Sequence, residues 1–151
     1  MDREPILICY DGSEESVRAI HAASITLAGR RAVVVDIGPV LTGAESYAAI
    51  APGVDVAMLQ QLNLQSAQER ANEGAKVARR AGFDAQTHVE LSAPTWQGII
   101  DLAGEIDAAL IVVGSRRLNG AREAFEGSVS HQVTKHANCP VLVVPAPRAD
   151  N

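Results

Sequence analysis

Short apolar runs and longer stretches of helical period alternate along this chain. Apolar runs that end at turn residues predict strands, and apolar residues that recur at helical spacing predict helices. On this basis we expect strands at residues 6–10, 33–37, 83–91, 108–113 and 141–144. We expect helices between Ser13 and Gly29, between Asp55 and Gly82, from Pro94 to about Glu105, and from Gly127 to His136. An irregular stretch at residues 40–53 interrupts the alternation, and its order stays open.

This alternation predicts a parallel sheet with helices on both faces, because each parallel crossover needs a covering helix. Residues 108–113 are continuously apolar, which is typical of a strand buried on both faces. Residues 83–91 alternate between apolar and polar positions, which suits an edge strand. We therefore expect one open α/β domain over residues 1–146, followed by a flexible tail at 147–151.

Two of the expected helices carry apolar residues that should face the sheet. The long second helix has an apolar stripe that begins at Val56, includes Leu62 and ends at Ala78. In the third helix, we expect Trp96 to pack the helix onto the sheet.

Composition agrees with a single domain whose core is aliphatic. The chain has 151 residues, of which 47% are hydrophobic, but only 2 are Phe, 2 are Tyr and 1 is Trp. Its net charge of −5 argues against nucleic-acid binding, which depends on many Lys and Arg to neutralise phosphates. No apolar run approaches the roughly 18–20 residues of a membrane-spanning helix. We expect neither a nucleic-acid nor a membrane partner, although one small anion in a local pocket is compatible with this charge.

The cysteines and histidines show no pattern typical of a metal site or a catalytic pair. Cys9 and Cys139 lie far apart, so we expect no disulfide framework and no structural zinc, and a reducing cytoplasm is the natural compartment. Cys9 falls inside a strand, where a thiol is usually inert, which leaves Cys139 as the more reactive candidate. His131 and His136 do not have the i, i+4 spacing of a shared metal-binding face. We expect no metal site and no enzyme.

Residues suited to anion binding cluster where the expected strands end. Ligands of open parallel sheets bind at the carboxyl ends of the strands. The first strand is followed by Asp11-Gly12-Ser13, the fourth by Gly114-Ser115-Arg116-Arg117, and the last helix begins at Gly127-Ser128-Val129-Ser130. Backbone N–H groups at a helix start, together with arginine side chains, attract phosphate. Each segment alone is more often an ordinary turn or helix cap, but together they predict an anion site. Neither a P-loop nor a Rossmann glycine pattern is present.

Four segments together resemble the universal stress protein family nearly end to end: residues 6–16, 112–116, 127–130 and 136–144. The resemblance implies an open five-stranded parallel sheet in the order 3-2-1-4-5, the adenine nucleotide alpha hydrolase-like fold. It also implies a homodimer that pairs through the last strand, Val141, Leu142, Val143 and Val144. In many members of the family ATP, or another adenine nucleotide such as AMP or ADP, binds at the ends of the first and fourth strands.

The resemblance also implies roles for individual residues. Asp11 would accept a hydrogen bond from the ribose or from the backbone of the pocket, and Ile37 would line the adenine mainly through its backbone. The phosphates would be wrapped by Gly114, Ser115 and Arg116, and would receive hydrogen bonds from the helix start formed by Gly127, Ser128, Val129 and Ser130.

One residue departs from the loop pattern G-x2-G-x9-G-[ST] of the ATP-binding members. Gly114 and the pair Gly127-Ser128 match the pattern, but Arg117 replaces its second glycine. Glycine permits positive φ and a close approach of the backbone to phosphate. Arg117 therefore either crowds the nucleotide or reaches a phosphate oxygen itself.

Two functions follow from these alternatives. The first is a dimeric stress-response regulator or sensor that binds ATP, with or without Mg²⁺, and hydrolyses it slowly at most. The second is a dimeric interaction module of the same fold whose phosphate loop is blocked by Arg117. The stress that is sensed and the downstream protein partner are not readable from the residues.

Overall fold

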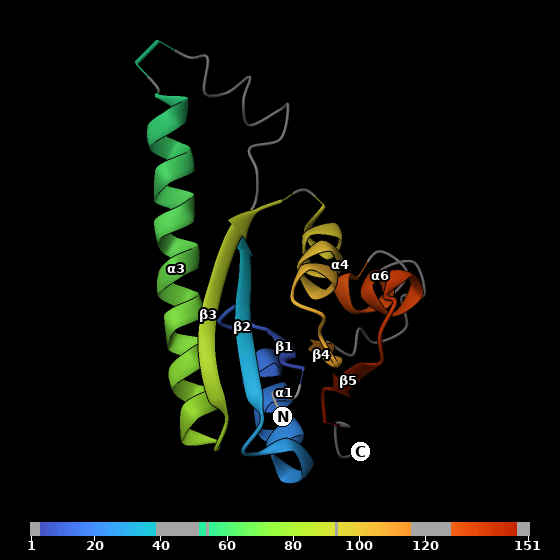
Figure 1. Cartoon of the computed structure of the whole chain (residues 1–151). Helices are drawn as coiled ribbons and strands as arrows, with labels where there is room; N and C mark the ends of the chain where they lie inside the picture. Colours follow the sequence, from blue (N-terminus) through green and yellow to red (C-terminus); the bar gives the residue numbers. More distant parts are fainter. Residues whose placement is uncertain (1–3, 39–51, 54, 93, 116–127, 148–151) are drawn as a thin grey trace.

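A computed structural model describes residues 4–38, 52–53, 55–92, 94–115 and 128–147. Strands and helices alternate within these ranges as the hydrophobic pattern predicts (Figure 1). The strands are β1 (Ile6–Cys9), β2 (Arg31–Gly38), β3 (Asp84–Leu91), β4 (Leu110–Ser115) and β5 (Val141–Pro145). The helices are α1 (Glu14–Leu27), α3 (Val56–Arg80), α4 (Thr95–Glu105) and α6 (Val129–His136).

The five strands form one sheet in the order β3-β2-β1-β4-β5, and every neighbouring pair is parallel. This confirms the fold class and the strand order, and it confirms the edge position of residues 83–91. Helices α1 and α3 cover one face of the sheet, and α4 and α6 cover the other (Figure 1). Successive strand residues alternate between the two apolar layers, so that Ile6 and Ile8 face α1 and α3 while Leu7 faces α4 and α6.

Local sequence sets the ends of several helices. Ser13 caps α1 by accepting a hydrogen bond from the N–H of Ser16 at 3.2 Å, and Asp55 caps α3 through the N–H groups of two following residues. Gly29 and Gly82, which were predicted to stop helices, follow α1 and α3 with φ of 84° and 100°. The N–H of Gly29 donates to the carbonyl of Gly82 at 2.7 Å, so the two helix ends are joined.

Two boundaries differ from the prediction. Strand β4 continues to Ser115, because Gly114 and Ser115 pair with Val144 and Pro145 of β5. A criterion based on apolar runs ends such a strand too early, since glycine interrupts the run. In α3, the predicted stripe is buried only from Ala67 onward, and Leu62 is 49% exposed. The reason is that the first turns of α3 extend beyond the end of the sheet (Figure 1).

Trp96 packs against the apolar layer under α4, as predicted, and also bridges two helices. Its ring stacks on the imidazole of His136 with 4.7 Å between ring centroids, which joins α4 to α6. No helix in the described ranges is both long enough and apolar enough to span a membrane.

Candidate functional site

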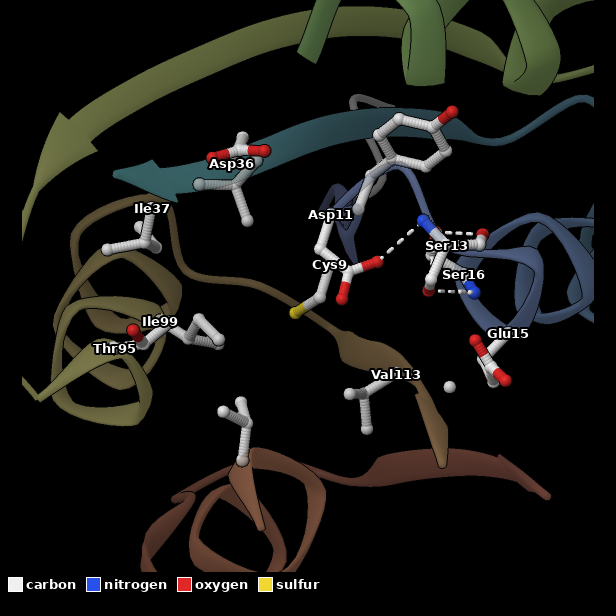
Figure 2. A pocket seen from close by; sticks show the side chains of 14 residues that line it. Cys9, Asp11, Ser13, Glu15, Ser16, Asp36, Ile37, Thr95, Ile99 and Val113 are labelled. Atoms are coloured by element: carbon white, nitrogen blue, oxygen red, sulfur yellow. Dashed lines mark hydrogen bonds between the residues drawn. The ribbon is translucent and has the colours of Figure 1, made fainter. Parts of the chain in front are cut away.

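A cavity of about 150 Å³ opens where β1, β2 and β4 end (Figure 2). We call it the strand-end cavity. The described residues around it are Cys9, Tyr10, Asp11, Ser13, Glu15, Ser16, Val35, Asp36, Ile37, Thr95, Ile99, Val113, Gly114 and Val129. The cavity therefore lies at the carboxyl edge of the sheet, where ligands of open parallel sheets bind.

The inner walls of the strand-end cavity are mostly apolar. Side chains of β2 and β4 face side chains of α4 and α6 across it, namely Val35, Ile37, Val113, Ile99 and Val129. Drug-sized ligands usually occupy cavities of about 300–1,000 Å³. A volume of about 150 Å³ therefore encloses only part of such a ligand, for example one planar heterocycle.

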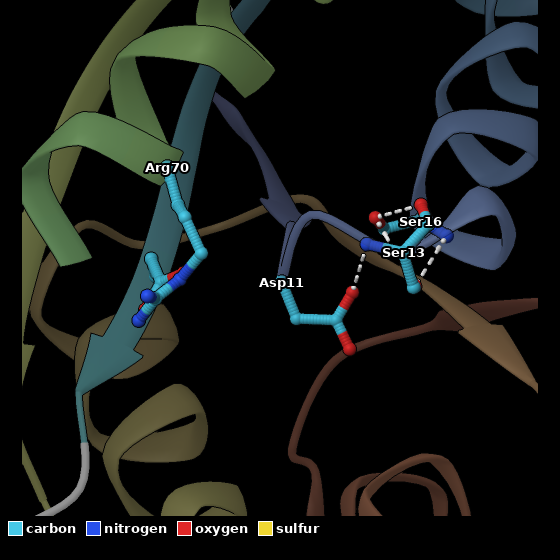
Figure 3. Close-up of polar contacts among 5 residues, drawn as sticks. Asp11, Ser13, Ser16 and Arg70 are labelled. Carbon is cyan, nitrogen blue, oxygen red and sulfur yellow. Dashed lines mark hydrogen bonds and ion pairs between the residues drawn. The ribbon is translucent and has the colours of Figure 1, made fainter. Parts of the chain in front are cut away.

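The turn between β1 and α1 forms the polar rim of the cavity. The Asp11 carboxylate accepts a hydrogen bond from the N–H of Ser13 at 2.9 Å (Figure 3). Gly12 has φ of 82°, a conformation that side chains rarely tolerate, and it turns the chain back into α1. Ser13 then caps the helix, and the Ser16 hydroxyl donates to the Ser13 carbonyl at 2.7 Å. This Asx turn holds Asp11 at the mouth of the cavity.

Three helices begin beside the strand-end cavity. Residues of the first turns of α1, α4 and α6 line it: Glu15, Thr95 and Val129. Helix N-termini carry partial positive charge and favour anions. At α6, the Ser128 hydroxyl accepts from the N–H of His131 at 3.2 Å, which confirms the predicted helix cap. Such a capped helix start still offers the first N–H groups of the helix to a ligand.

Gly114 is required by the packing of α1 against β4. A Cβ atom at this position would lie 2.5 Å from the carbonyl oxygen of Glu15, far inside the normal contact distance. The glycine therefore lets the start of α1 approach the end of β4. This packing role is separate from any contact with a ligand, and the loop pattern alone does not reveal it.

Neither cysteine is activated as a nucleophile. Burial, and secondly the carboxylate of Asp11, raise the pKa of Cys9 to about 12, although its sulfur points toward the cavity (Figure 2). Burial also raises the pKa of Cys139, which lines a second cavity of about 180 Å³ beside the C-terminal end of α4. A reactive thiol usually has a lowered pKa in an electropositive environment. The raised pKa of Cys139 therefore does not support the expectation that it is the more reactive thiol.

The structure brings four of the predicted site residues to the strand-end cavity: Asp11, Ile37, Gly114 and Val129. Ser115 and Ser130 are buried nearby, and Ser128 is the cap of α6, but these serines do not line the cavity. Arg116, Arg117 and Gly127 lie outside the described residues. No group of three or more His, Cys, Asp or Glu in the described ranges is arranged to hold a metal ion.

Sequence reasoning missed the walls that α4 contributes, Thr95 and Ile99. Helix α4 follows the edge strand β3 in the chain, and no local pattern places its start beside the ends of β1 and β4. Its place over the strand-end cavity follows from the strand order, in which the crossover from β3 to β4 passes over β2 and β1.

Comparisons with known proteins agree with this architecture. The model of the universal stress protein family matches residues 2–145. Universal stress protein YxiE of Bacillus subtilis is 32% identical over 157 residues, which cover 92% of this chain and 97% of YxiE. A universal stress protein from Archaeoglobus fulgidus, solved in complex with dAMP, superposes with a TM-score of 0.66 at 23% identity, covering 95% of this chain and 99% of that one. A family protein from Arabidopsis thaliana, solved with AMP bound, gives a TM-score of 0.66 at 15% identity, covering 96% and 93%.

Proposed function

Because the chain belongs to the universal stress protein family, we propose that it binds an adenine nucleotide in the strand-end cavity and acts as a dimeric stress-response regulator or sensor. The observation that carries this proposal is a small, mostly apolar cavity beside the starts of three helices. The apolar walls suit a purine ring, and the helix N-termini favour phosphate. The complexes of the A. fulgidus and A. thaliana proteins with dAMP and AMP support an adenine ligand.

In this proposal the two ends of the nucleotide meet different parts of the chain. The base lies between β2 and α4, with Ile37 and Ile99 on its two sides, and the ribose donates a hydrogen bond to Asp11. The phosphates lie toward the start of α6. The residues proposed to bind them are Gly114, Ser115, Arg116, Arg117, Gly127, Ser128, Val129 and Ser130.

We propose ATP as the ligand, with AMP and ADP as the alternatives. In nucleotide sites Mg²⁺ is commonly held by the phosphates themselves and by one or two carboxylates. Asp11 and Glu15 at the rim fit that role if Mg²⁺ accompanies the nucleotide. We propose that hydrolysis is slow at most, because the carboxylates at the rim are accompanied by no histidine or lysine in the described lining that could stabilise the transferred phosphate.

The homodimer is proposed to form through the outer edge of β5, with which no strand of the described residues pairs. This edge carries no charge from Val141 to Val144, and all four residues are only half-buried in the single chain. The opposite edge is different, because the guanidinium of Arg79 donates two hydrogen bonds to the carbonyl of Ala85 in β3, at 3.0 and 2.8 Å. An uncharged free edge is a template for pairing with another strand, whereas a covered carbonyl resists it. We place this dimer in the cytoplasm, where the two free cysteines would stay reduced.

Calorimetric titration with adenosine, AMP, ADP and ATP, with and without Mg²⁺, tests the nucleotide proposal. We expect saturable binding by the wild type and a loss of about tenfold or more for Asp11→Ala, since a hydrogen bond to a charged group contributes about 1.5–3 kcal/mol. Asp101→Ala is the matched control, because Asp101 lies on the exposed side of α4 and pairs only locally with Gln97. It should bind like the wild type.

Arg117→Gly separates the two functions that the sequence leaves open. If the wild type binds, the nucleotide function holds: weaker ATP binding by the variant then means that Arg117 reaches a phosphate oxygen, and equal or tighter binding means that it does not. If only the variant binds, the chain is a dimeric interaction module of the same fold whose phosphate loop is blocked by Arg117. If neither protein binds any adenine ligand, the strand-end cavity serves another purpose and the proposal is wrong.

A further inference from the structure

A half-buried ion pair joins α3 to the end of β2 behind the strand-end cavity. The guanidinium of Arg70 donates from Nε to Oδ2 of Asp36 at 2.7 Å and from Nη2 to Oδ1 at 3.1 Å. Asp36 is only 4% exposed, and the side chain of Arg70 is 36% exposed. A two-pronged contact of this kind fixes the orientation of both side chains as well as their distance.

The position of Asp36 in β2 connects this ion pair to the cavity. Successive strand residues point to opposite faces, so the Asp36 carboxylate points toward α3 while Ile37 belongs to the layer under α4 (Figure 2). The same stretch of backbone therefore carries the ion pair on one face and a cavity wall on the other. An interaction that fixes the backbone at Asp36 therefore also fixes the position of Ile37.

Arg70 also lies against the turn that carries Asp11. Figure 3 shows the Arg70 side chain descending from α3 onto the end of β2, beside the turn that carries Asp11. A Cβ atom on Gly12 would be 3.5 Å from Cδ of Arg70, which is ordinary contact distance. The hydrogen bond that Arg70 donates to Asp36 raises the pKa of Arg70 against the opposing effect of burial, and the negative charge of Asp11 is close enough to add to this rise. One side chain thus contacts the ends of β1 and β2, between which the strand-end cavity opens.

We infer that Arg70 is a positioning residue for the nucleoside part of the ligand: it sets the spacing between Asp11 and Ile37 without touching the ligand itself. The inference rests on the proposed function. The inference goes beyond that function by assigning a role to a residue on α3, a helix that contributes no residue to the described lining of the cavity. Because the positioned groups face the base and ribose, loss of Arg70 should weaken the binding of adenosine, AMP and ATP by the same factor.

The chain offers a matched control on the same helix. Arg79 also joins α3 to the sheet through two guanidinium hydrogen bonds, here to the carbonyl of Ala85. It lies nine residues further along α3, about 14 Å at 1.5 Å per residue, and away from the strand-end cavity. Both arginines anchor the helix, but only Arg70 reaches the ends of β1 and β2.

The experiment compares Arg70→Met, Arg70→Lys and Arg79→Met with the wild type. Titration calorimetry gives the Kd of adenosine, AMP and ATP, and thermal unfolding gives the stability of each protein. For Arg70→Met we expect all three Kd values to rise by about tenfold or more, as happens when a residue that orients a metal ligand is removed. Arg70→Lys keeps the charge but lacks the planar fork, so it should restore part of the affinity and remains available if Arg70→Met does not fold. Arg79→Met should lower stability and leave the Kd values unchanged.

Three results overturn the inference. The first is wild-type affinity in both Arg70 variants. The second is an equal loss of affinity in Arg79→Met, which would show that anchoring of the helix is the whole effect. The third is a wild type that binds no adenine ligand, which overturns the proposed function as well and is thereby distinguished from the first two.

Discussion

Replacement of Gly114 by alanine tests whether this glycine serves packing or ligand binding. The added Cβ would lie 2.5 Å from the carbonyl oxygen of Glu15 and 2.7 Å from its carbonyl carbon. Cβ contacts below 3.0 Å essentially do not occur, so the start of α1 must move away from β4 by about 0.5 Å or more. The obstacle is the backbone of Glu15 at a capped helix start, which cannot rotate aside as a flexible side chain would.

Overpacking of this kind typically costs about 1–3 kcal/mol. For a domain of this size, each kcal/mol lowers Tm by about 2–4 °C, so we expect Gly114→Ala to lower Tm by about 2–12 °C. Urea unfolding at a fixed protein concentration gives the change in free energy directly. The movement also displaces the Asp11–Ser13 turn, so the affinity for AMP should fall together with the stability.

Gly104→Ala is the matched control. Gly104 lies in α4 with no other heavy atom within 4 Å of an added Cβ, and its φ is not positive. Alanine in a helix is favoured over glycine by roughly 0.5–1 kcal/mol, so this variant should be slightly more stable than the wild type. Equal or increased stability of Gly114→Ala would refute the packing argument and return Gly114 to a role in ligand approach.

Two further predictions concern the thiol in the cavity and the proposed dimer. The raised pKa of Cys9, about 12 against an ordinary 9.0, means that the folded thiol stays protonated at pH values where the unfolded thiol ionises. Its contribution to stability is complete below pH 9 and is lost as the pH rises toward 12, with about 1.4 kcal/mol gone at pH 10. Urea unfolding at pH 7 and pH 10 should show a loss in the wild type that is larger by about 1.4 kcal/mol than the loss in Cys9→Ala, in which Cys139 and Tyr10 still titrate with raised pKa values; equal pH dependence in both proteins would contradict it. For the dimer, Val143→Lys places a charge in the middle of the uncharged β5 edge and should give a monomer by size-exclusion chromatography with light scattering. Val143 belongs to neither apolar layer, so the fold should tolerate the change. Gln86→Lys on β3 should stay dimeric. A dimeric Val143→Lys protein would place the interface elsewhere.

The elements that sequence predicts well are those set by local chemistry. Ser13 caps α1 and Ser128 caps α6 because a hydroxyl reaches N–H groups a few residues away, and Gly29 and Gly82 stop helices because they adopt positive φ. These interactions depend on near neighbours and are visible in the chain. The strand order is different, since periodicity does not reveal which strands are neighbours. It was predicted from the family resemblance and is confirmed by the sheet.

The parts of the site that sequence did not predict depend on distant residues. Asp36 and Arg70 are 34 positions apart, and neither stands out as a motif. Gly114 was recognised from a loop pattern, but its contact with Glu15 joins the ends of two elements separated by most of the chain. The exposure of Leu62 depends on where the sheet ends beneath α3, and a helical stripe does not contain that information.

The proposed ligand has two parts, the nucleoside and the phosphates, and their binding can be tested separately because different residues are proposed to contact each part. The strand-end cavity and the Arg70–Asp36 pair are proposed to act on the base and ribose, whereas Arg116 and Arg117 belong to the segment proposed to meet the phosphates. Arg70→Met should therefore change the affinities for adenosine and ATP by one common factor. Arg117→Gly should change the ratio of the two affinities, because only ATP carries the charge that an arginine attracts. If both variants changed the ratio alike, the cavity and the phosphate loop would form a single coupled site, and the separation argued from the geometry would fail.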